Sequence, residues 1–147
     1  MKYKSTRGQV SGLGFSDALL MGLASDNGLL VPETIPDVST TLEHWRGLGF
    51  VELAQEIMPL FIDDIEPTVL KSLVAESYAT FDHDEVVGMQ QLDNLTVLEL
   101  FHGPTLAFKD YALQVVGKLF NYVLERKKKT VTIIGATSGD TGSAAIE

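Results

Sequence analysis

The sequence predicts an α/β protein made of two successive parts, and two observations carry this prediction. Residues 16–80 contain several short stretches in which apolar side chains recur at helical spacing. From residue 91 onward the order becomes strand, long helix, strand, and a loop that begins another helix. This order is typical of a parallel sheet. We therefore expect a mostly helical unit with short strands over residues 1–90 and the start of an α/β domain over residues 91–147.

The first elements of the chain are expected to be short. Residues 1–6 should form a strand, and the segment "SDALLMGLA" has the spacing of a helix for which Ser16 is the expected N-cap. The sequence "DNG" predicts a turn. A short extended segment should follow this turn and end at Pro32.

Three further helices complete the first part. The segments "TTLEHWRGLG" and "FVELAQEIMPLF" each predict a short helix, and Pro59 should end or kink the second one. The segment "EPTVLKSLVAESYATF" gives the clearest helical pattern, with Pro67 suited to its first turn. Its apolar side chains at helical spacing are Val69, Leu70, Leu73, Val74 and Ala79.

The second part alternates strand and helix. The segment "NLTVLELF" predicts a strand, "TLAFKDYALQVVGKLFNYVLERK" a long helix, and "TVTIIGA" an apolar strand rich in β-branched residues. The segment "TSGDTGSAAIE" predicts a loop and the first turns of another helix. Two strands with these helices cannot complete a parallel sheet. We therefore expect the chain to be the N-terminal piece of a longer protein.

Composition narrows the classes of function. The formal net charge is −9, and an acidic surface repels nucleic acids and anionic membranes. The chain has no cysteine, so disulfides, zinc–thiolate sites and thiol catalysis are excluded, and no bound metal is expected. No apolar run approaches the roughly 18 residues of a membrane helix. The segment "MKYKSTRGQVSG" lacks the apolar core of a signal peptide. A cytoplasmic protein is the expectation.

One lysine stands in an otherwise apolar helical face. On a helical wheel of residues 106–126, the polar stripe is Asp110, Gln114, Gly117, Lys118, Asn121 and Glu125. Lys109 lies off this stripe, on the face formed by Ala112, Leu113, Val116 and Phe120. Burial and the positive end of a helix both disfavour the charged ammonium. A lysine that loses its proton near neutral pH is a nucleophile. The alternative is a lysine that extends from the first helical turn to water.

The segment "GATSGDTGS" follows an expected strand and begins a helix. Its glycines allow the backbone to approach a ligand closely, and the free amides of a helix start can bind an anion. The spacing fits neither a Walker loop nor the dinucleotide-binding fingerprint. We expect this loop to bind a carboxylate or a phosphate, and the alternative is an ordinary helix start after a flexible turn. The hydroxyl donors of the loop are Thr137, Ser138, Thr141 and Ser143.

In their order and distance, the lysine and the loop resemble the threonine synthase family, pyridoxal-phosphate enzymes of the tryptophan-synthase-β fold group. Four segments carry the resemblance: "KYKSTRG", "GLASDNGLLVPE", "ELFHGPTLAFKD" and "IIGATSGDTGSAAIE". The last two are highly specific, and together the four span most of the chain. One departure is "DNGLL", where the family often has Asp-Gly-Gly followed by leucine and an aromatic residue. This departure affects a turn and leaves the chemistry undisturbed.

The resemblance implies a fold, a reaction and a set of roles. The second part would begin a pyridoxal-phosphate fold type II domain, incomplete at its C-terminus. Lys109 would be the Schiff-base lysine and would also move protons on the substrate carbons. The reaction would convert O-phospho-L-homoserine and water to L-threonine and phosphate, with pyridoxal 5'-phosphate as cofactor. Arg7 could contact the substrate phosphate. The loop that would bind the substrate carboxylate comprises Thr137, Ser138, Gly139, Asp140 and Thr141.

The resemblance also leaves alternatives. In this fold group, the loop that binds the cofactor phosphate lies further along the chain. Residues 1–147 alone should therefore be inactive and bind the cofactor poorly, and if folded they could form a homo-oligomer. A first alternative is another fold type II lyase, such as a dehydratase, a cysteine synthase or a threonine-synthase-like phospho-lyase. A second is a non-catalytic folding or assembly module with a simple anion site.

Overall fold

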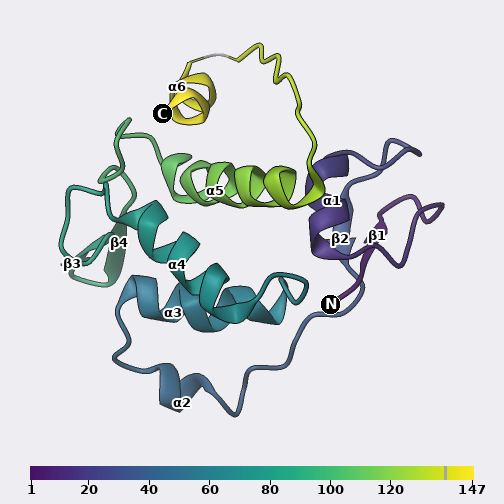
Figure 1. The fold of residues 1–147 in the computed structure, drawn as a ribbon. Helices are drawn as coiled ribbons and strands as arrows, with labels where there is room; N and C mark the ends of the chain where they lie inside the picture. The colour runs from purple at the N-terminus through teal and green to yellow at the C-terminus, as the bar shows by residue number, and fades with distance from the viewer. Residues whose placement is uncertain (138) are drawn as a thin grey trace. The chain divides into compact units, whose positions relative to one another are not determined.

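The computed structural model describes residues 1–137 and 139–147 as mixed helices and small sheets (Figure 1). The chain divides into two compact units. Unit 1 comprises residues 1–48 and 52–71, and unit 2 comprises residues 49–51 and 72–147. Among the described residues, no helix combines the length and the apolar character needed to cross a bilayer.

Unit 1 begins with the expected strand and turn. Strand β1 (Tyr3–Ser5) pairs antiparallel with β2 (Leu30–Pro32), with Tyr3 opposite Pro32. The turn before β2 contains Asn27 at φ +60°, a conformation that asparagine tolerates well. The carboxylate of Asp26 accepts hydrogen bonds from the Ser5 hydroxyl at 2.6 Å and from the Gly28 N–H at 2.9 Å. The predicted strand, turn and stop at Pro32 are confirmed.

Helix α1 (Phe15–Met21) corrects the predicted cap. Its N-cap is Gly14 and not Ser16, which lies buried within the first turn. The backbone N–H of Ser16 donates to Asp64 Oδ2 at 2.8 Å. An acceptor from a distant part of unit 1 therefore satisfies the helix start, a role that the sequence pattern assigned to the serine hydroxyl.

The helices that follow agree with the sequence pattern. They are α2 (Leu42–Trp45), α3 (Phe50–Ile57) and α4 (Pro67–Tyr78). Helix α3 gives way to a short 3₁₀ helix, η1 (Met58–Leu60), which contains Pro59. Because proline cannot donate a backbone hydrogen bond, the helix ends where the sequence predicts. Pro67 opens α4, also as predicted.

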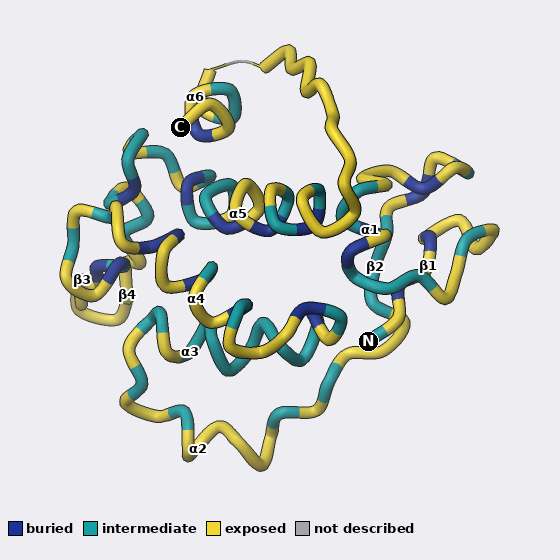
Figure 2. Tube along the Cα trace, in the orientation of Figure 1, coloured by how far each residue is buried: buried dark blue, intermediate teal, exposed yellow. Residues whose placement is uncertain are grey.

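Unit 2 is built around the long helix α5 (Asp110–Lys127). The buried stripe of α5 consists of Val115, Leu119 and Val123, at intervals of four residues (Figure 2). The hydroxyl of Tyr78 donates to the carbonyl oxygen of Tyr111 at 2.9 Å, which joins α4 to α5. Burial raises the pKa of Tyr78 to about 12, so this donor keeps its proton at any physiological pH.

A β-hairpin precedes α5. Strand β3 (Gly88–Leu92) pairs antiparallel with β4 (Leu95–Glu99), and Gly88 lies opposite Glu99. The strand expected from "NLTVLELF" is therefore present. Its partner is the neighbouring strand, because a two-residue turn brings the two together. The parallel pairing expected for this strand does not occur among the described residues.

The second expected strand is absent. Residues 129–137 carry no helix or strand and are exposed, as the yellow stretch between α5 and α6 in Figure 2 shows. Ile133 and Ile134 are 80% and 92% exposed. An apolar strand requires neighbouring strands that satisfy its backbone groups, and no described strand lies beside it. The predicted helix after it is present as α6 (Asp140–Ile146).

Candidate active site

The candidate nucleophile stands at the start of the long helix. Lys109 is the N-cap of α5, with helical backbone angles, and its carbonyl oxygen accepts the N–H of Leu113 at 2.9 Å. Its Nζ lies 4.3 Å from the ring centroid of Phe108. A cation over an aromatic face is weakly stabilised. The side chain is half-buried, and it neither lies in the core nor extends fully into water.

The helical face assigned to Lys109 is only partly correct. The described structure buries Val115, Leu119 and Val123, whereas Val116 on the predicted apolar face is 38% exposed. Asp110, placed by the sequence pattern on the polar stripe, has no exposed surface at all. The pattern could not distinguish these faces, because α5 carries apolar side chains on more than one side.

A pocket of about 480 Å³ opens beside Lys109. It combines the lysine with the end of the strand before it, with the first turn of α5 and with Thr141 of α6. The structure therefore brings Lys109 and one residue of the predicted anion loop to the same pocket. Its lining is mostly apolar: Leu100, Phe108, Tyr111, Ala112 and Leu113, together with Lys109 and Thr141.

Two backbone N–H groups at the start of α6 donate hydrogen bonds to the hydroxyl oxygen of Thr137. The Thr137 hydroxyl accepts N–H hydrogen bonds from Gly142 at 2.9 Å and from Gly139 at 3.3 Å. Gly139 has φ +135°, and a Cβ on Gly142 would lie 2.6 Å from the Thr137 hydroxyl oxygen. Both glycines are therefore required by this geometry. The loop amides converge on an acceptor, as an anion site requires.

Asp140 and Arg7 are not among the residues that line this pocket. Asp140 is exposed in the first turn of α6. Arg7 is exposed and belongs to unit 1, where its N–H donates to the Ser5 hydroxyl at 3.1 Å. Ser138 lies outside the described residues.

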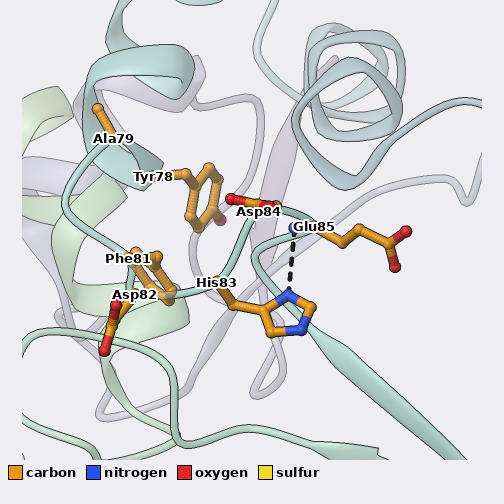
Figure 3. A pocket seen from close by; sticks show the side chains of 7 residues that line it. All are labelled: Tyr78, Ala79, Phe81, Asp82, His83, Asp84 and Glu85. Atoms are coloured by element: carbon orange, nitrogen blue, oxygen red, sulfur yellow. Dashed lines mark hydrogen bonds between the residues drawn. The ribbon is translucent and has the colours of Figure 1, made fainter.

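A second pocket, of about 690 Å³, was not predicted from the sequence (Figure 3). It is lined by Tyr78, Ala79, Phe81, Asp82, His83, Asp84 and Glu85. His83 Nδ1 accepts the N–H of Glu85 at 3.1 Å, which fixes the ring by a local turn. The His83 ring also packs against the His102 ring, with centroids 4.5 Å apart. The lining residues come from one short stretch of the chain, residues 78–85, which matches no motif used in the sequence analysis.

Gly103 supplies a test of the backbone that leads to Lys109. A Cβ on Gly103 would overlap the buried Asp110 side chain, so Gly103→Ala should destabilise the protein by about 1–3 kcal/mol. Gly117→Ala is the matched control, because a Cβ there meets nothing within 4 Å and alanine is the better helix former. This control should stabilise by about 0.5–1 kcal/mol. Denaturant unfolding measures the free energy of unfolding of both variants. Equal changes in Gly103→Ala and Gly117→Ala would contradict the close packing of Gly103 on Asp110.

Comparisons with known proteins agree in naming one family. A family model described as threonine synthase N terminus matches residues 2–78, more than half of the chain. Threonine synthase of Pseudomonas aeruginosa is 53% identical, over 100% of this chain and 32% of its own length. Threonine synthase-like 2 of Xenopus laevis is 46% identical, over 100% of this chain and 32% of its own length.

A solved structure also indicates similarity to threonine synthase. The structure of pyridoxal-phosphate-bound threonine synthase from Brucella melitensis superposes with a TM-score of 0.95 at 48% identity. The match covers 99% of this chain and 32% of that chain. The chain thus spans about a third of the length of the relatives that it matches.

Proposed function

This chain belongs to the threonine synthase family, and we propose that it forms part of an enzyme that converts O-phospho-L-homoserine and water to L-threonine and phosphate. The observation that carries the proposal is the shared pocket of Lys109 and Thr141, which joins the candidate nucleophile to the anion loop. The high similarity to threonine synthases over the whole chain supports it.

The pocket beside Lys109 fits pyridoxal phosphate in size and character. The flat aromatic ring of the cofactor requires an apolar pocket with an amine at its edge. This pocket, with a volume of about 480 Å³, has a mostly apolar lining and includes the amine of Lys109. Lys109 would hold the cofactor covalently through Nζ, and Phe108 and Leu100 would line its environment. Once bound, the cofactor would act as an electron sink for the substrate carbons.

The residues of this chain would then bind and orient the substrate. We assign the substrate carboxylate to the loop that comprises Thr137, Ser138, Gly139, Asp140 and Thr141. The convergence of the Gly139 and Gly142 amides on the Thr137 oxygen supports this assignment, because a carboxylate oxygen is an acceptor of the same kind. Lys109 Nζ would carry protons between substrate carbons, since it stands at the same pocket.

Four further assignments are part of the proposal. Arg7 would contact the leaving phosphate, because a guanidinium binds phosphate through paired donors. The protein would have two domains in this region. They are the helical unit over residues 1–90 and the cofactor-binding part that begins over residues 91–147. We also propose a cytoplasmic location and a homo-oligomer for the whole protein.

A lyase of the same fold group is the second candidate, because the similarity to threonine synthase-like 2 is nearly as high. The full-length protein should be supplied with O-phospho-L-homoserine, and the products should be separated. Threonine with stoichiometric phosphate supports the proposal, whereas a keto acid would identify a phospho-lyase. A protein without turnover that forms no lysine adduct on borohydride reduction with the cofactor would be an assembly module.

Thr141 provides a test of the carboxylate assignment. Thr141→Val should raise KM for the substrate about 10- to 150-fold, the equivalent of a lost hydrogen bond to a charged group of about 1.5–3 kcal/mol. Thr141→Ser keeps the hydroxyl and should stay close to the parent protein. Steady-state kinetics and cofactor titration separate the possible results. Loss of the cofactor at unchanged KM would reassign this hydroxyl to the cofactor.

A further inference from the structure

The residue after Lys109 is a carboxylate with no exposed surface. Both oxygens of Asp110 accept hydrogen bonds from Thr105: the backbone N–H donates to Oδ2 at 2.8 Å, and the hydroxyl donates to Oδ1 at 2.8 Å. Burial of a charge is costly unless it is compensated by such donors. The positive end of the 18-residue helix α5 adds to this compensation.

The Asp110 carboxylate binds the loop of residues 103–109, and we call this set of contacts the clamp. The other hydrogen bonds within the loop are short-range backbone bonds of turns. The N–H of Leu106 donates to the Gly103 carbonyl oxygen at 3.0 Å, and the N–H of Asp110 donates to the Ala107 carbonyl oxygen at 3.0 Å. Gly103 packs so closely on Asp110 that a Cβ would overlap the carboxylate. Asp110 therefore holds this segment through two hydrogen bonds from Thr105 and through close packing against Gly103.

The clamp holds a strained residue. Leu106 has φ +62° although it is 70% exposed. A non-glycine residue in this region costs of order 1–3 kcal/mol and persists only where surrounding contacts enforce it. The exposed leucine side chain offers no core contact that would enforce it. The bonds of Thr105 to Asp110 lie on one side of Leu106 and the start of α5 lies on the other.

We propose that Asp110 and Thr105 are positioning residues for Lys109, and this proposal rests on the proposed role of Lys109 as the lysine that holds the cofactor. The contact shown for Lys109 Nζ is the ring of Phe108, which is itself an exposed side chain. The position of the amine at the pocket wall therefore depends mainly on its backbone. A displacement of about 1 Å at a reacting group can cost 10²-fold in rate.

Thr105 allows a test in which shape and hydrogen bonding are separated. In the full-length protein, Thr105→Val preserves the shape and the N–H bond and removes the hydroxyl bond, so kcat should fall about tenfold or more at a KM within about twofold of the parent. Thr105→Ser keeps both donors and should restore most of kcat. Thr96→Val removes an exposed hydroxyl bond to Gln91 in the hairpin and should leave kcat unchanged.

A second measurement needs no bound cofactor. Amide hydrogen exchange in the peptide that covers residues 103–110 of the cofactor-free protein should be at least about tenfold faster in Asp110→Asn, because the substituted amide opposes one Thr105 donor. Exchange in the peptide that covers β3 and β4 is the internal reference. Thermal unfolding should show that each variant is folded at the temperature of the assay.

The outcomes separate this inference from the function on which it rests. If borohydride reduction traps no cofactor on Lys109 of the parent protein, the proposed function fails. If the parent is trapped on Lys109 but Thr105→Val keeps the parental kcat, the positioning role is overturned. Unchanged exchange at residues 103–110 in Asp110→Asn overturns the clamp itself, whatever the activity.

Discussion

Replacement of Lys109 by alanine should abolish threonine formation by the full-length protein and the visible absorbance of lysine-bound cofactor. The amine at the wall of the apolar pocket would serve as both the attachment point and the proton carrier, so no other group replaces it. Lys109→Arg should be equally inactive, because a guanidinium stays protonated and cannot attack the cofactor aldehyde. Absorbance spectra and threonine assays measure both effects.

Another lysine of the same helix is the control. Lys118 is exposed on α5 and forms a surface ion pair with Glu76 at 3.6 Å. Such pairs contribute little, so Lys118→Ala should retain activity and cofactor absorbance. Threonine formation by Lys109→Ala at a parental rate would remove the central assignment. Equal losses in both variants would point to a general effect of charge on the helix.

Residues 1–147 by themselves should form no threonine and should bind pyridoxal phosphate weakly. In the described structure, Ile133 and Ile134 of the expected strand are 80% and 92% exposed. Strand-forming apolar residues normally need cover on both faces. The relatives with this activity in their names are about three times as long as the matched region. The pocket at Lys109 therefore offers only part of what a phosphorylated cofactor needs.

Titration of purified residues 1–147 with cofactor, followed by absorbance, measures this expectation. The full-length protein at the same concentration is the positive control. Exposed apolar segments also favour self-association, so the sedimentation of the sample should be recorded with the titration. Tight stoichiometric binding together with threonine formation would show that these residues are sufficient for the activity.

Local patterns predicted many of the elements correctly. Pro59 and Pro67 mark helix boundaries in the structure, because a missing N–H acts on the helix in which it occurs. The "DNG" turn is also where the sequence places it. The long helix α5 ends at Lys127 as predicted, but it begins at Asp110 and not at Thr105. The pairing of Lys109 with the "TSGDTG" loop followed from a resemblance over two specific segments, and the pocket joins Lys109 to Thr141.

Properties that depend on distant partners could not be predicted in this way. The strand expected at residues 130–136 is irregular, because strand formation requires neighbours that the pattern does not encode. Strand β4 was expected to pair in a parallel sheet, and it pairs with β3 instead. The cap of α1 was assigned to Ser16, but Asp64 supplies the acceptor from 48 residues away.

The sequence by itself determined the helix boundaries at Pro59 and Pro67 and the tight turn at "DNG", because each depends on contacts within a few residues. Only the tertiary structure decided which face of α5 is buried. It also decided that Asp110 lies beneath the loop that leads to Lys109 and binds Thr105 with both oxygens. A helical wheel places Asp110 among polar residues. Its burial follows from the folding of residues 103–105 back onto the helix start, where two donors and the helix dipole compensate a charge that water would otherwise solvate.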